Sequence, residues 1–518
     1  MSYVSAADST SPFDVAIVGF GPAGAVAACW LGLFGIRTIV LEKSRKIYDI
    51  PRAIALDHEV MRVFQNLGVV HEVLPHTAPF PASEHFGVDG QLIRKIHVVD
   101  PPYPQGYTPT LVFTQPAVES ILRARAVSYP GVSVWLGAEV TSVRQDGQST
   151  CFDVSADDGN AVTLRASYLI ACDGASSSIR QIIGLRLEDL GFDEPWMVVD
   201  VLVNENSLGK LPKTAAQYCN PARPTTFIIG PGNHRRWEIM LREDEDPRAM
   251  ESPENVWRLL SPWIDPSDGT LWRASSYRFH ALVAERWRRD RIFLAGDAAH
   301  QQPPFIGQGM CQGIRDVTNL CWKLNAVIRD RTPTHLLDTY EEERKRHVET
   351  LTTRIKEIGR HICERNPETA RKRDESLLMQ GGGKAPVVIR QDIVPPLTCG
   401  ILERQDKQAR GTLFPQPVVM TDRGERLLDE VTGCGWRLVM DGRHAHSVDA
   451  GEVEMDEIVV GPMGFHETNG LLAQWFDKHR CVAAIVRPDQ YVFGVATSAA
   501  DIAELLLEWH TKLFSPDV

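Results

Sequence analysis

The chain has 518 residues, of which 43% are hydrophobic and 24% are charged, a composition typical of globular proteins. This length is too great for one ordinary hydrophobic core and predicts two or three domains. The net charge is −12, and no basic stretch is interleaved with aromatic residues, which argues against nucleic acid as a partner.

The first residues of the chain, from Met1 to Pro12, are polar and lack the basic and apolar regions of a secretory signal peptide. We therefore expect a polar tail on a cytoplasmic protein. Ten cysteines are scattered along the chain with no Cys-x-x-Cys pair, so a zinc ribbon or a dithiol site has no support. We predict thiols in a reducing compartment and no metal site.

A βαβ unit is predicted directly after this tail. Residues 13–18 are rich in β-branched side chains and predict a buried strand, residues 25–34 predict a helix, and residues 36–41 predict a second strand. The uncharged stretch 15–36 also satisfies the pattern of a membrane span. Three glycines and a proline between the first strand and the helix favour the soluble βαβ unit.

The glycines of this unit have the spacing of a dinucleotide-binding loop. Gly19 permits the tight turn, Gly21 lets the backbone approach a pyrophosphate, and Gly24 lets the helix pack closely on the strand. The helix N-terminus supplies free N–H groups and a partial positive charge for the phosphates. Glu42 ends the second strand, about 20 residues on, where a carboxylate can accept ribose hydroxyls. Lys43 follows it and is included among the expected cofactor contacts.

The remaining sequence divides into segments with different patterns of apolar and polar residues. We predict a discontinuous first domain at 13–185 and 286–395, with a small substrate-side segment at about 76–109. Residues 186–285 alternate between apolar and polar positions, which predicts an inserted sheet that forms a lid or floor over a substrate. Residues 396–518 have their own strand and helix signals and predict a small α/β domain.

Hydrophobic periodicity also predicts individual elements within these segments. Helices are expected at 115–127, 309–328, 341–363 and 499–509. Strands are expected at 132–135, 166–170, 197–203, 225–229, 236–241, 291–295 and 481–486. Residues 365–395 are charged or rich in glycine and proline, and predict a loop or linker.

A second glycine signature follows the strand expected at 291–295. Asp297 ends that strand and can accept hydrogen bonds from the sugar-alcohol hydroxyls of FAD, and backbone N–H groups at the next helix start can stabilise negative charge on a reduced flavin. Taken alone, this loop is also explained by an ordinary Gly/Pro turn. Paired with the first signature about 280 residues earlier, it predicts FAD held at both ends. The expected contacts here are Gly296, Asp297, Pro303, Gly307, Gly309 and Met310.

A third motif, Asp173-Gly174, follows an apolar strand between these two signatures. An Asp-Gly pair in that position is often only a turn. In their order along the chain, the three motifs resemble those of the class A flavoprotein aromatic hydroxylases, in which the Asp-Gly motif is associated with binding of both FAD and NAD(P)H. The 3-(3-hydroxyphenyl)propionate hydroxylase branch is most similar, at residues 50–57, 234–238, 307–324 and 411–417.

The resemblance implies an α/β protein with a Rossmann-like FAD-binding domain, an inserted mixed-sheet substrate domain and a C-terminal thioredoxin-like α/β domain. The last domain lacks paired cysteines, so we expect no redox role for it. By the same resemblance, Arg52 would reach the FAD pyrophosphate and Gln115 the ribityl chain. From the residues alone, Arg52 is also explained as a surface arginine and Gln115 as a polar residue at a helix start. Cys311 stands where many relatives have Asn.

The chemistry implied is hydroxylation of a phenol. NAD(P)H reduces FAD, O2 adds to give a flavin C4a-hydroperoxide, and one oxygen passes to the aromatic ring, while the protein positions the ring and excludes water. A second dinucleotide fingerprint is missing, so we expect NAD(P)H to dock transiently. The resemblance favours a monocyclic phenol with an acidic side chain in aromatic catabolism. The alternative is a hydroxylase of a polycyclic aromatic polyketide.

The catalytic candidates are Pro304, whose carbonyl would lie near the reacting oxygen, and a base that removes the phenol proton. Asp57, Tyr218 and His280 are the candidates for this base, and each is also explained by a structural role. Arg223, Arg235, Arg236 and Arg278 are candidates for binding a substrate carboxylate, and each is also explained as a solvated arginine. No amphipathic basic helix is evident, so stable membrane insertion is not expected. The oligomeric state, with a homodimer as one option, stays open.

Overall fold

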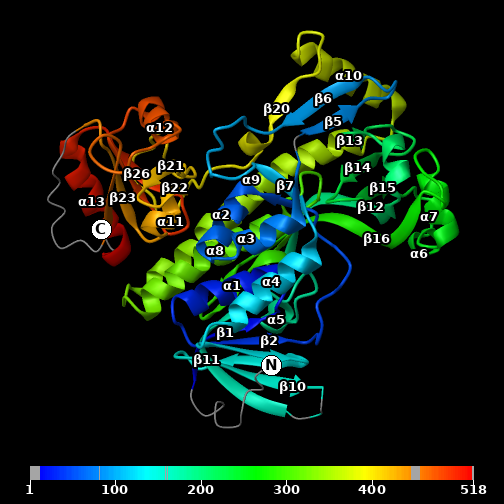
Figure 1. Ribbon diagram of the computed structural model, residues 1–518. Helices are drawn as coiled ribbons and strands as arrows, with labels where there is room; N and C mark the ends of the chain where they lie inside the picture. Colours follow the sequence, from blue (N-terminus) through cyan, green and yellow to red (C-terminus); the bar gives the residue numbers. More distant parts are fainter. Residues whose placement is uncertain (1–11, 81, 158, 160, 445–454, 516–518) are drawn as a thin grey trace.

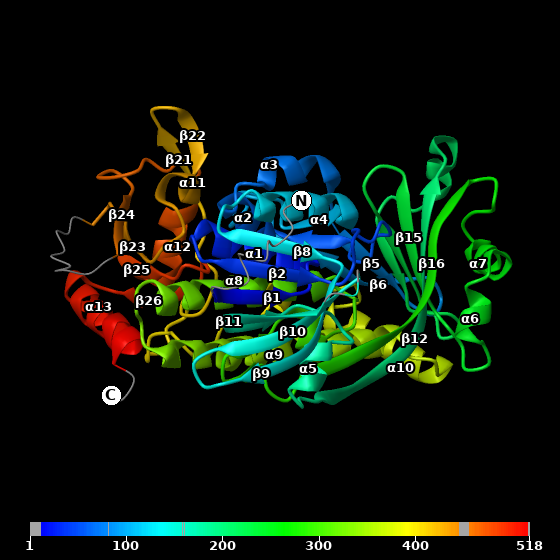
Figure 2. The ribbon, with the colours of Figure 1, turned by 90° about the horizontal axis from the view of Figure 1, so that it is seen from below.

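The structure is a computed structural model that describes residues 12–80, 82–157, 159, 161–444 and 455–515 (Figure 1). The expected polar tail therefore lies almost wholly outside the described residues. A C-terminal α/β unit forms one end of the molecule, and a large, mostly antiparallel sheet forms the other (Figure 2). A sheet whose central strands are parallel, with its helices, lies between them.

The central sheet has eight strands and contains the predicted βαβ unit. Strand β1 pairs in parallel with both β2 and β11, and β11 pairs in parallel with β18. The main path runs β17 (Arg288–Arg289), β18 (Ile292–Leu294), β11 (Ala161–Ala171), β1 (Phe13–Val18), β2 (Thr38–Glu42) and β8 (Val132–Leu136). Beside this path, β10 (Thr150–Ala156) pairs with β11, and β9 (Ala138–Gln145) pairs with β10.

The helices of this central unit include two that match the predicted bounds to the residue. These are α4 (Gln115–Val127) and α8 (Gly309–Ile328). Helix α1 (Pro22–Leu33) begins earlier than predicted, because proline is well suited to the first helical position, where an N–H is not needed. The other helices are α2 (His58–Asn66), α3 (Val70–Val73), α5 (Ser178–Ile182) and α9 (Asp338–Ile362). A three-stranded sheet, β3 (Ala55–Asp57), β7 (Thr110–Phe113) and β4 (Thr77–Pro79), completes the unit.

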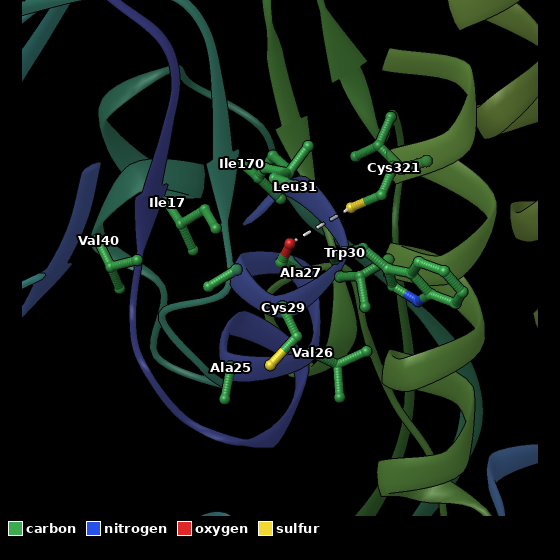
Figure 3. Close-up of a cluster of buried hydrophobic side chains, with 14 of the residues drawn as sticks. Ile17, Ala25, Val26, Ala27, Cys29, Trp30, Leu31, Val40, Ile170 and Cys321 are labelled. Carbon is green, nitrogen blue, oxygen red and sulfur yellow. Dashed lines mark hydrogen bonds between the residues drawn. The ribbon is translucent and has the colours of Figure 1, made fainter. Parts of the chain in front are cut away.

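Helix α1 is buried between the central sheet and α8 (Figure 3). Ala25, Ala27 and Ala28 are fully buried, and the Cys321 thiol of α8 contacts the Ala27 carbonyl at 3.9 Å. The Trp30 indole donates to the Thr318 hydroxyl at 3.3 Å. The uncharged stretch that satisfied a membrane-span pattern is therefore a strand and a core helix. Across the described ranges, no helix combines the length and the apolar character that crossing a bilayer requires.

A nine-stranded mixed sheet stands beside this unit. Residues 187–284 supply its five central strands, and strands from three other parts of the chain extend its edges. Its order is β19 (His300–Gln301), β16 (Gly269–Ala284), β12 (Leu187–Val203), β15 (His234–Met240), β14 (Thr225–Ile229), β13 (Ala215–Tyr218), β5 (Ala82–Phe86), β6 (Leu92–His97) and β20 (Val387–Ile389). One face packs on α6 (Pro247–Met250) and α7 (Pro253–Leu260) through an apolar cluster.

The segment 365–395 was predicted to be a loop or linker, and this prediction was wrong. It forms α10 (Pro367–Gln380), and β20 then pairs in parallel with β6. The Asn366 side chain caps the helix by accepting from two backbone N–H groups, and Pro367 occupies the first turn. The glycines that suggested a loop lie just beyond the helix end.

The C-terminal unit is a four-stranded mixed sheet between two helices. The sheet order is β24 (Asp456–Val460), β23 (Arg437–Asp441), β25 (Ala483–Val486) and β26 (Val492–Ala496), with only β23 and β24 parallel. Helix α12 (Leu471–His479) packs on one face and α13 (Ala499–Phe514) on the other. A hairpin of β21 (Val418–Thr421) and β22 (Gly424–Leu427) and the short α11 (Leu428–Thr432) precede the sheet.

Candidate active site

A cavity of about 520 Å³ lies where the carboxyl ends of the central parallel strands face the nine-stranded sheet. The loops that follow β1, β11 and β18 form one wall, and side chains of β12, β13, β14 and β15 form the opposite wall. The carboxyl edge of a parallel sheet is the usual ligand site of this architecture.

Most of the residues predicted to bind a cofactor meet at this cavity. They come from segments far apart in the chain, and the structure brings ten of the predicted site residues to its lining, namely Gly21, Arg52, Gln115, His280, Gly296, Asp297, Pro304, Gly307, Gly309 and Met310. Six others are adjacent to the lining or at the end of β2 without forming part of it: Gly19, Gly24, Glu42, Lys43, Asp173 and Pro303.

The first glycine loop is held by close backbone contacts. Gly19 has φ +97°, and a Cβ at Gly24 would stand 2.1 Å from the Gly19 carbonyl oxygen. A Cβ at Gly21 would meet no atom within 4 Å, so this backbone is open towards the cavity. Glu42 accepts the Phe20 N–H at 2.7 Å and thereby fixes the loop to the end of β2.

Two helix N-termini open on the cavity. Gly21 is the N-cap of α1 and Gln308 is the N-cap of α8, and neither helix start is capped by a side chain. No acidic residue occupies the first turn of either helix. Their free N–H groups and partial positive charge therefore suit an anionic group at each end of the cavity.

Polar side chains between these helix ends also fit a long cofactor. The Asp297 carboxylate is exposed to the cavity, and burial of the site raises its pKa, an effect that His300 and Arg52 oppose. Gln115 Oε1 accepts the N–H groups of Arg52, at 3.0 Å, and Ala53, at 2.6 Å, and so fixes the arginine loop. This leaves the Arg52 guanidinium exposed at the cavity, where it contacts the Tyr48 ring.

The Asp173-Gly174 motif supports the same region. Asp173 Oδ2 accepts the Ile179 N–H at 3.1 Å and so anchors the start of α5, while its Oδ1 atom is buried without a partner among the described residues. Gly174 has φ +84° and lines the cavity. Arg180, on α5, donates to the Ala298 carbonyl at 2.8 Å and ties this motif to the second glycine signature.

Two of the predicted catalytic bases do not reach the cavity, and we correct them. Asp57 is buried as the N-cap of α2 and pairs with Arg315; burial opposes ionisation, but Arg315 and His58 hold its pKa below the usual range. Tyr218 points to the other face of the nine-stranded sheet, where it stacks on Phe86 at 5.7 Å. Asp57 is therefore a structural carboxylate and Tyr218 a packing residue.

Two of the arginines proposed for a substrate carboxylate, Arg236 and Arg278, line the cavity but are already paired within the protein. Arg236 is buried and donates to Asp200 and to the carbonyls of Pro51 and Arg52. Arg278 pairs with Asp193 at 2.5 Å. Three charged residues that the sequence did not single out, Glu238, Arg273 and Arg390, also line the cavity.

The fold and this site define a flavoprotein, because one cavity joins two uncapped helix N-termini, an open glycine backbone and a free carboxylate. Residues 12–355 match the family model described as FAD binding domain, and residues 411–511 match the HcaD C-terminal domain. The chain belongs to this family of FAD-dependent aromatic hydroxylases and is an NAD(P)H-dependent monooxygenase. The resemblance noted in the sequence is thereby confirmed.

Similar proteins cover nearly the whole chain. A probable NADH-specific resorcinol 4-hydroxylase of Rhodococcus jostii (strain RHA1) is 37% identical over 511 residues, which is 96% of this chain and 94% of that protein. A 3-(3-hydroxy-phenyl)propionate/3-hydroxycinnamic acid hydroxylase of Burkholderia cenocepacia (strain HI2424) is 33% identical, with 96% of each chain covered.

Solved structures share the fold. The flavin-dependent monooxygenase PieE, solved with FAD and substrate, has a TM-score of 0.80 at 20% identity and covers 97% of this chain and 99% of its own. Aklavinone-11 hydroxylase, solved with FAD and aklavinone, has a TM-score of 0.79 at 23% identity, with 96% and 98% covered. At these identities the likeness establishes the architecture alone.

Proposed function

We propose that this enzyme hydroxylates a monocyclic phenol with an acidic side chain, using NAD(P)H, O2 and FAD. The two relatives described above, 37% and 33% identical, are named for resorcinol and for 3-(3-hydroxyphenyl)propionate or 3-hydroxycinnamic acid, which are monocyclic phenols. The second name denotes substrates with a carboxylate. These names give no support to the polycyclic alternative.

The main evidence that the substrate has an acidic side chain is the position of Arg390. Its guanidinium is buried on the cavity wall, donates to the Ile306 carbonyl, and leaves Nε without a partner among the described residues. No carboxylate pairs with it in the described part of the chain. Burial lowers the pKa of Arg390 to about 10, so the group is still cationic at neutral pH. A buried cation without an anionic partner favours an anionic ligand.

The proposed activity is tested by NAD(P)H oxidation with the FAD-loaded protein and mass detection of the product. The panel pairs 3-(3-hydroxyphenyl)propionate with its uncharged amide, and adds resorcinol and a polycyclic phenol. We expect the acid to stimulate oxidation and to gain one oxygen at lower concentrations than the amide. Hydroxylation of the polycyclic phenol alone would contradict the proposal.

Arg390→Met tests the carboxylate contact. We expect KM for the phenolic acid to rise about 10- to 100-fold, because hydrogen bonds to charged groups contribute about 1.5–3 kcal/mol. KM for the uncharged amide should change little. Arg371→Met, which removes an exposed arginine of α10, is the matched control. An equal rise in KM for acid and amide would show that Arg390 acts through the fold or the flavin, and titration of FAD fluorescence separates those two.

Several sequence predictions stay proposals. Pro304 and Gln115 line the cavity, but their contacts with the flavin stay predictions. The division into domains at 13–185 with 286–395, 186–285 and 396–518 is testable by limited proteolysis. We also propose a cytoplasmic location without stable membrane insertion. A homodimer stays a prediction that light scattering of the purified protein would test.

A further inference from the structure

Glu238 is a buried carboxylate on the cavity wall. Its side chain belongs to β15 and lines the cavity, yet the residue is only 4% exposed. Across the described residues, no hydrogen bond reaches the carboxylate. A buried carboxylate normally has several partners, because removing its charge from water is costly. An unpartnered carboxylate that faces a ligand cavity therefore suggests that the ligand supplies the missing donor.

The neighbours of Glu238 in the sheet do not donate hydrogen bonds to its carboxylate. Thr226 of β14 and Val198 of β12 lie directly opposite, and both line the cavity. The Thr226 hydroxyl donates to Gln217 Oε1 at 2.7 Å, and the Gln217 amide donates to the Thr225 carbonyl at 3.2 Å. Thr226 and Gln217 therefore donate to other acceptors, and neither forms a hydrogen bond with the Glu238 carboxylate.

A second carboxylate on the same face of the sheet shows the contrast. Asp200 of β12 is fully buried and is bound by His234 at 2.6 Å and by Arg236 at 2.7 Å. Arg273 of β16 lies 3.6 Å away. Asp200 therefore holds together the strands behind the arginine loop, whereas Glu238 has no comparable structural role.

From this geometry we propose that the Glu238 carboxylate accepts the proton of the substrate's phenolic hydroxyl and is the catalytic base of the hydroxylation. The inference deepens the proposed function and rests on it. The phenol O–H bond breaks, an Oε–H bond forms on Glu238, and the electron pair stays on the phenolate oxygen. The phenolate ring is the better nucleophile for the oxygen supplied by the flavin chemistry. The proton then returns to the hydroxyl oxygen of the product, which regenerates the carboxylate.

The charges around Glu238 suit this role. Burial raises its pKa to about 7; Arg236 on the same strand and Arg273 on β16 oppose the rise, and Asp200 on β12 adds to it. The neighbouring β14 presents Thr226 and Ile228, which do not titrate at these pH values. A base with a pKa near the working pH is effective because enough of it is unprotonated while it still binds a proton well.

The predicted base that does line the cavity, His280, is a weaker candidate. Its Nδ1 atom lies 3.2 Å from Asp193 on the adjacent strand, and its side chain is one-third exposed. It thus has a carboxylate partner within the protein, whereas Glu238 has none. The two assignments differ in which substitution, at Glu238 or at His280, removes the pH dependence of the hydroxylation.

The test uses the FAD-loaded full chain and the phenol that the substrate panel identifies. In the wild type, coupled hydroxylation should fall about tenfold per pH unit below about pH 7, because the base is then protonated. Glu238→Gln should lower the rate at pH 8 about 100-fold or more and remove this acidic limb. His280→Asn should keep the limb. Glu188→Gln, an exposed glutamate of β12, is the control with unchanged activity.

A second readout does not depend on turnover. Binding of the phenol to the oxidised protein, without NAD(P)H, is compared with binding of its methyl ether, which has no proton to donate. In the wild type the preference for the phenol should rise with pH through about 7, as Glu238 ionises and accepts the phenolic O–H, and Glu238→Gln should lack this rise. An unchanged rise and an intact acidic limb in the variant would overturn the proposal. Loss of the limb in His280→Asn alone would assign the base to His280.

If Glu238→Gln does not fold, two other measurements still decide the proposal. Glu238→Asp keeps the charge, and it should retain the acidic limb at a reduced rate. In the wild type itself, a preference for the phenol over its methyl ether that does not change with pH would contradict the proposal. If no phenol stimulates NAD(P)H oxidation by the wild type, the proposed function fails. An active wild type with an unaffected variant refutes only the role of Glu238.

Discussion

Asp429→Ala is expected to destabilise the protein by about 3–5 kcal/mol, the usual result of removing one partner from a buried ion pair. The Asp429 carboxylate is fully buried between two arginines and binds Arg62 at 2.7 Å and Arg437 at 2.7 Å. Arg62 belongs to α2 of the central unit, and Arg437 belongs to β23 of the C-terminal unit. The substitution therefore leaves two guanidinium groups buried without their anion, at the contact between the two units.

The measurement is urea unfolding followed by the intrinsic tryptophan fluorescence of the protein. Asp422→Ala, an exposed aspartate in the β21–β22 hairpin, is the matched control and should unfold like the wild type. The flanking arginines hold the pKa of Asp429 at about 2, although burial alone would raise it. This pKa is below that of an unfolded aspartate, so the stabilisation is present above about pH 4 and is lost as the pH falls towards 2. A variant with the unfolding midpoint of the wild type would contradict the prediction.

The effect should extend to cofactor binding. Tyr491 of the C-terminal unit donates to Glu59 at 2.9 Å, Glu59 binds Arg315, and Arg315 donates to Gln308 Oε1 at 2.8 Å. Gln308 is the N-cap of α8, whose first residues line the cavity. A loosened C-terminal unit should therefore weaken FAD binding, which titration of FAD fluorescence would show. This gives the C-terminal unit a structural role, in agreement with its lack of paired cysteines.

The sequence predicted well the elements that are determined by local residue patterns. The helices at 115–127 and 309–328 were placed to the residue, because their hydrophobic periodicity is strong and their first turns are marked by Pro116 and by the glycines at 307 and 309. Helix α10 was missed because its charged residues and the glycines that follow it were taken as signs of a loop, although a helix N-cap signal was present. Asn366-Pro367 followed by good helix formers was the available signal.

The sequence could not supply contacts that depend on tertiary pairing. Arg315 meets Asp57 across 258 positions, so nothing local marked Asp57 as a structural partner rather than a base. Arg390 reaches the cavity because β20 pairs with β6, in a register that joins Val387 to Lys95. Alternation along β15 puts Arg236 and Glu238 on one face, but only the packing of the sheet shows that this face is the cavity wall.

Gly21→Ala and Gly24→Ala are expected to fail in different ways, although both change one glycine of the same loop. At Gly24 the new methyl group would stand 2.1 Å from the Gly19 carbonyl oxygen and 3.4 Å from the Cys172 side chain. The backbone of α1 must then shift away from β1, and overpacking of this kind costs about 1–3 kcal/mol or more. The protein without FAD should therefore melt at a lower temperature.

At Gly21 the new methyl group meets no protein atom within 4 Å, and the backbone there, at φ −68°, is one that alanine adopts readily. The stability of the protein without FAD should be unchanged. The methyl group would instead occupy the space through which the start of α1 approaches the FAD pyrophosphate, so FAD affinity should fall at least tenfold. Thermal melting without FAD and fluorescence titration with FAD measure the two effects separately. If Gly21→Ala binds FAD as tightly as the wild type, the pyrophosphate does not lie against this glycine, and the cofactor assignment of the loop is wrong.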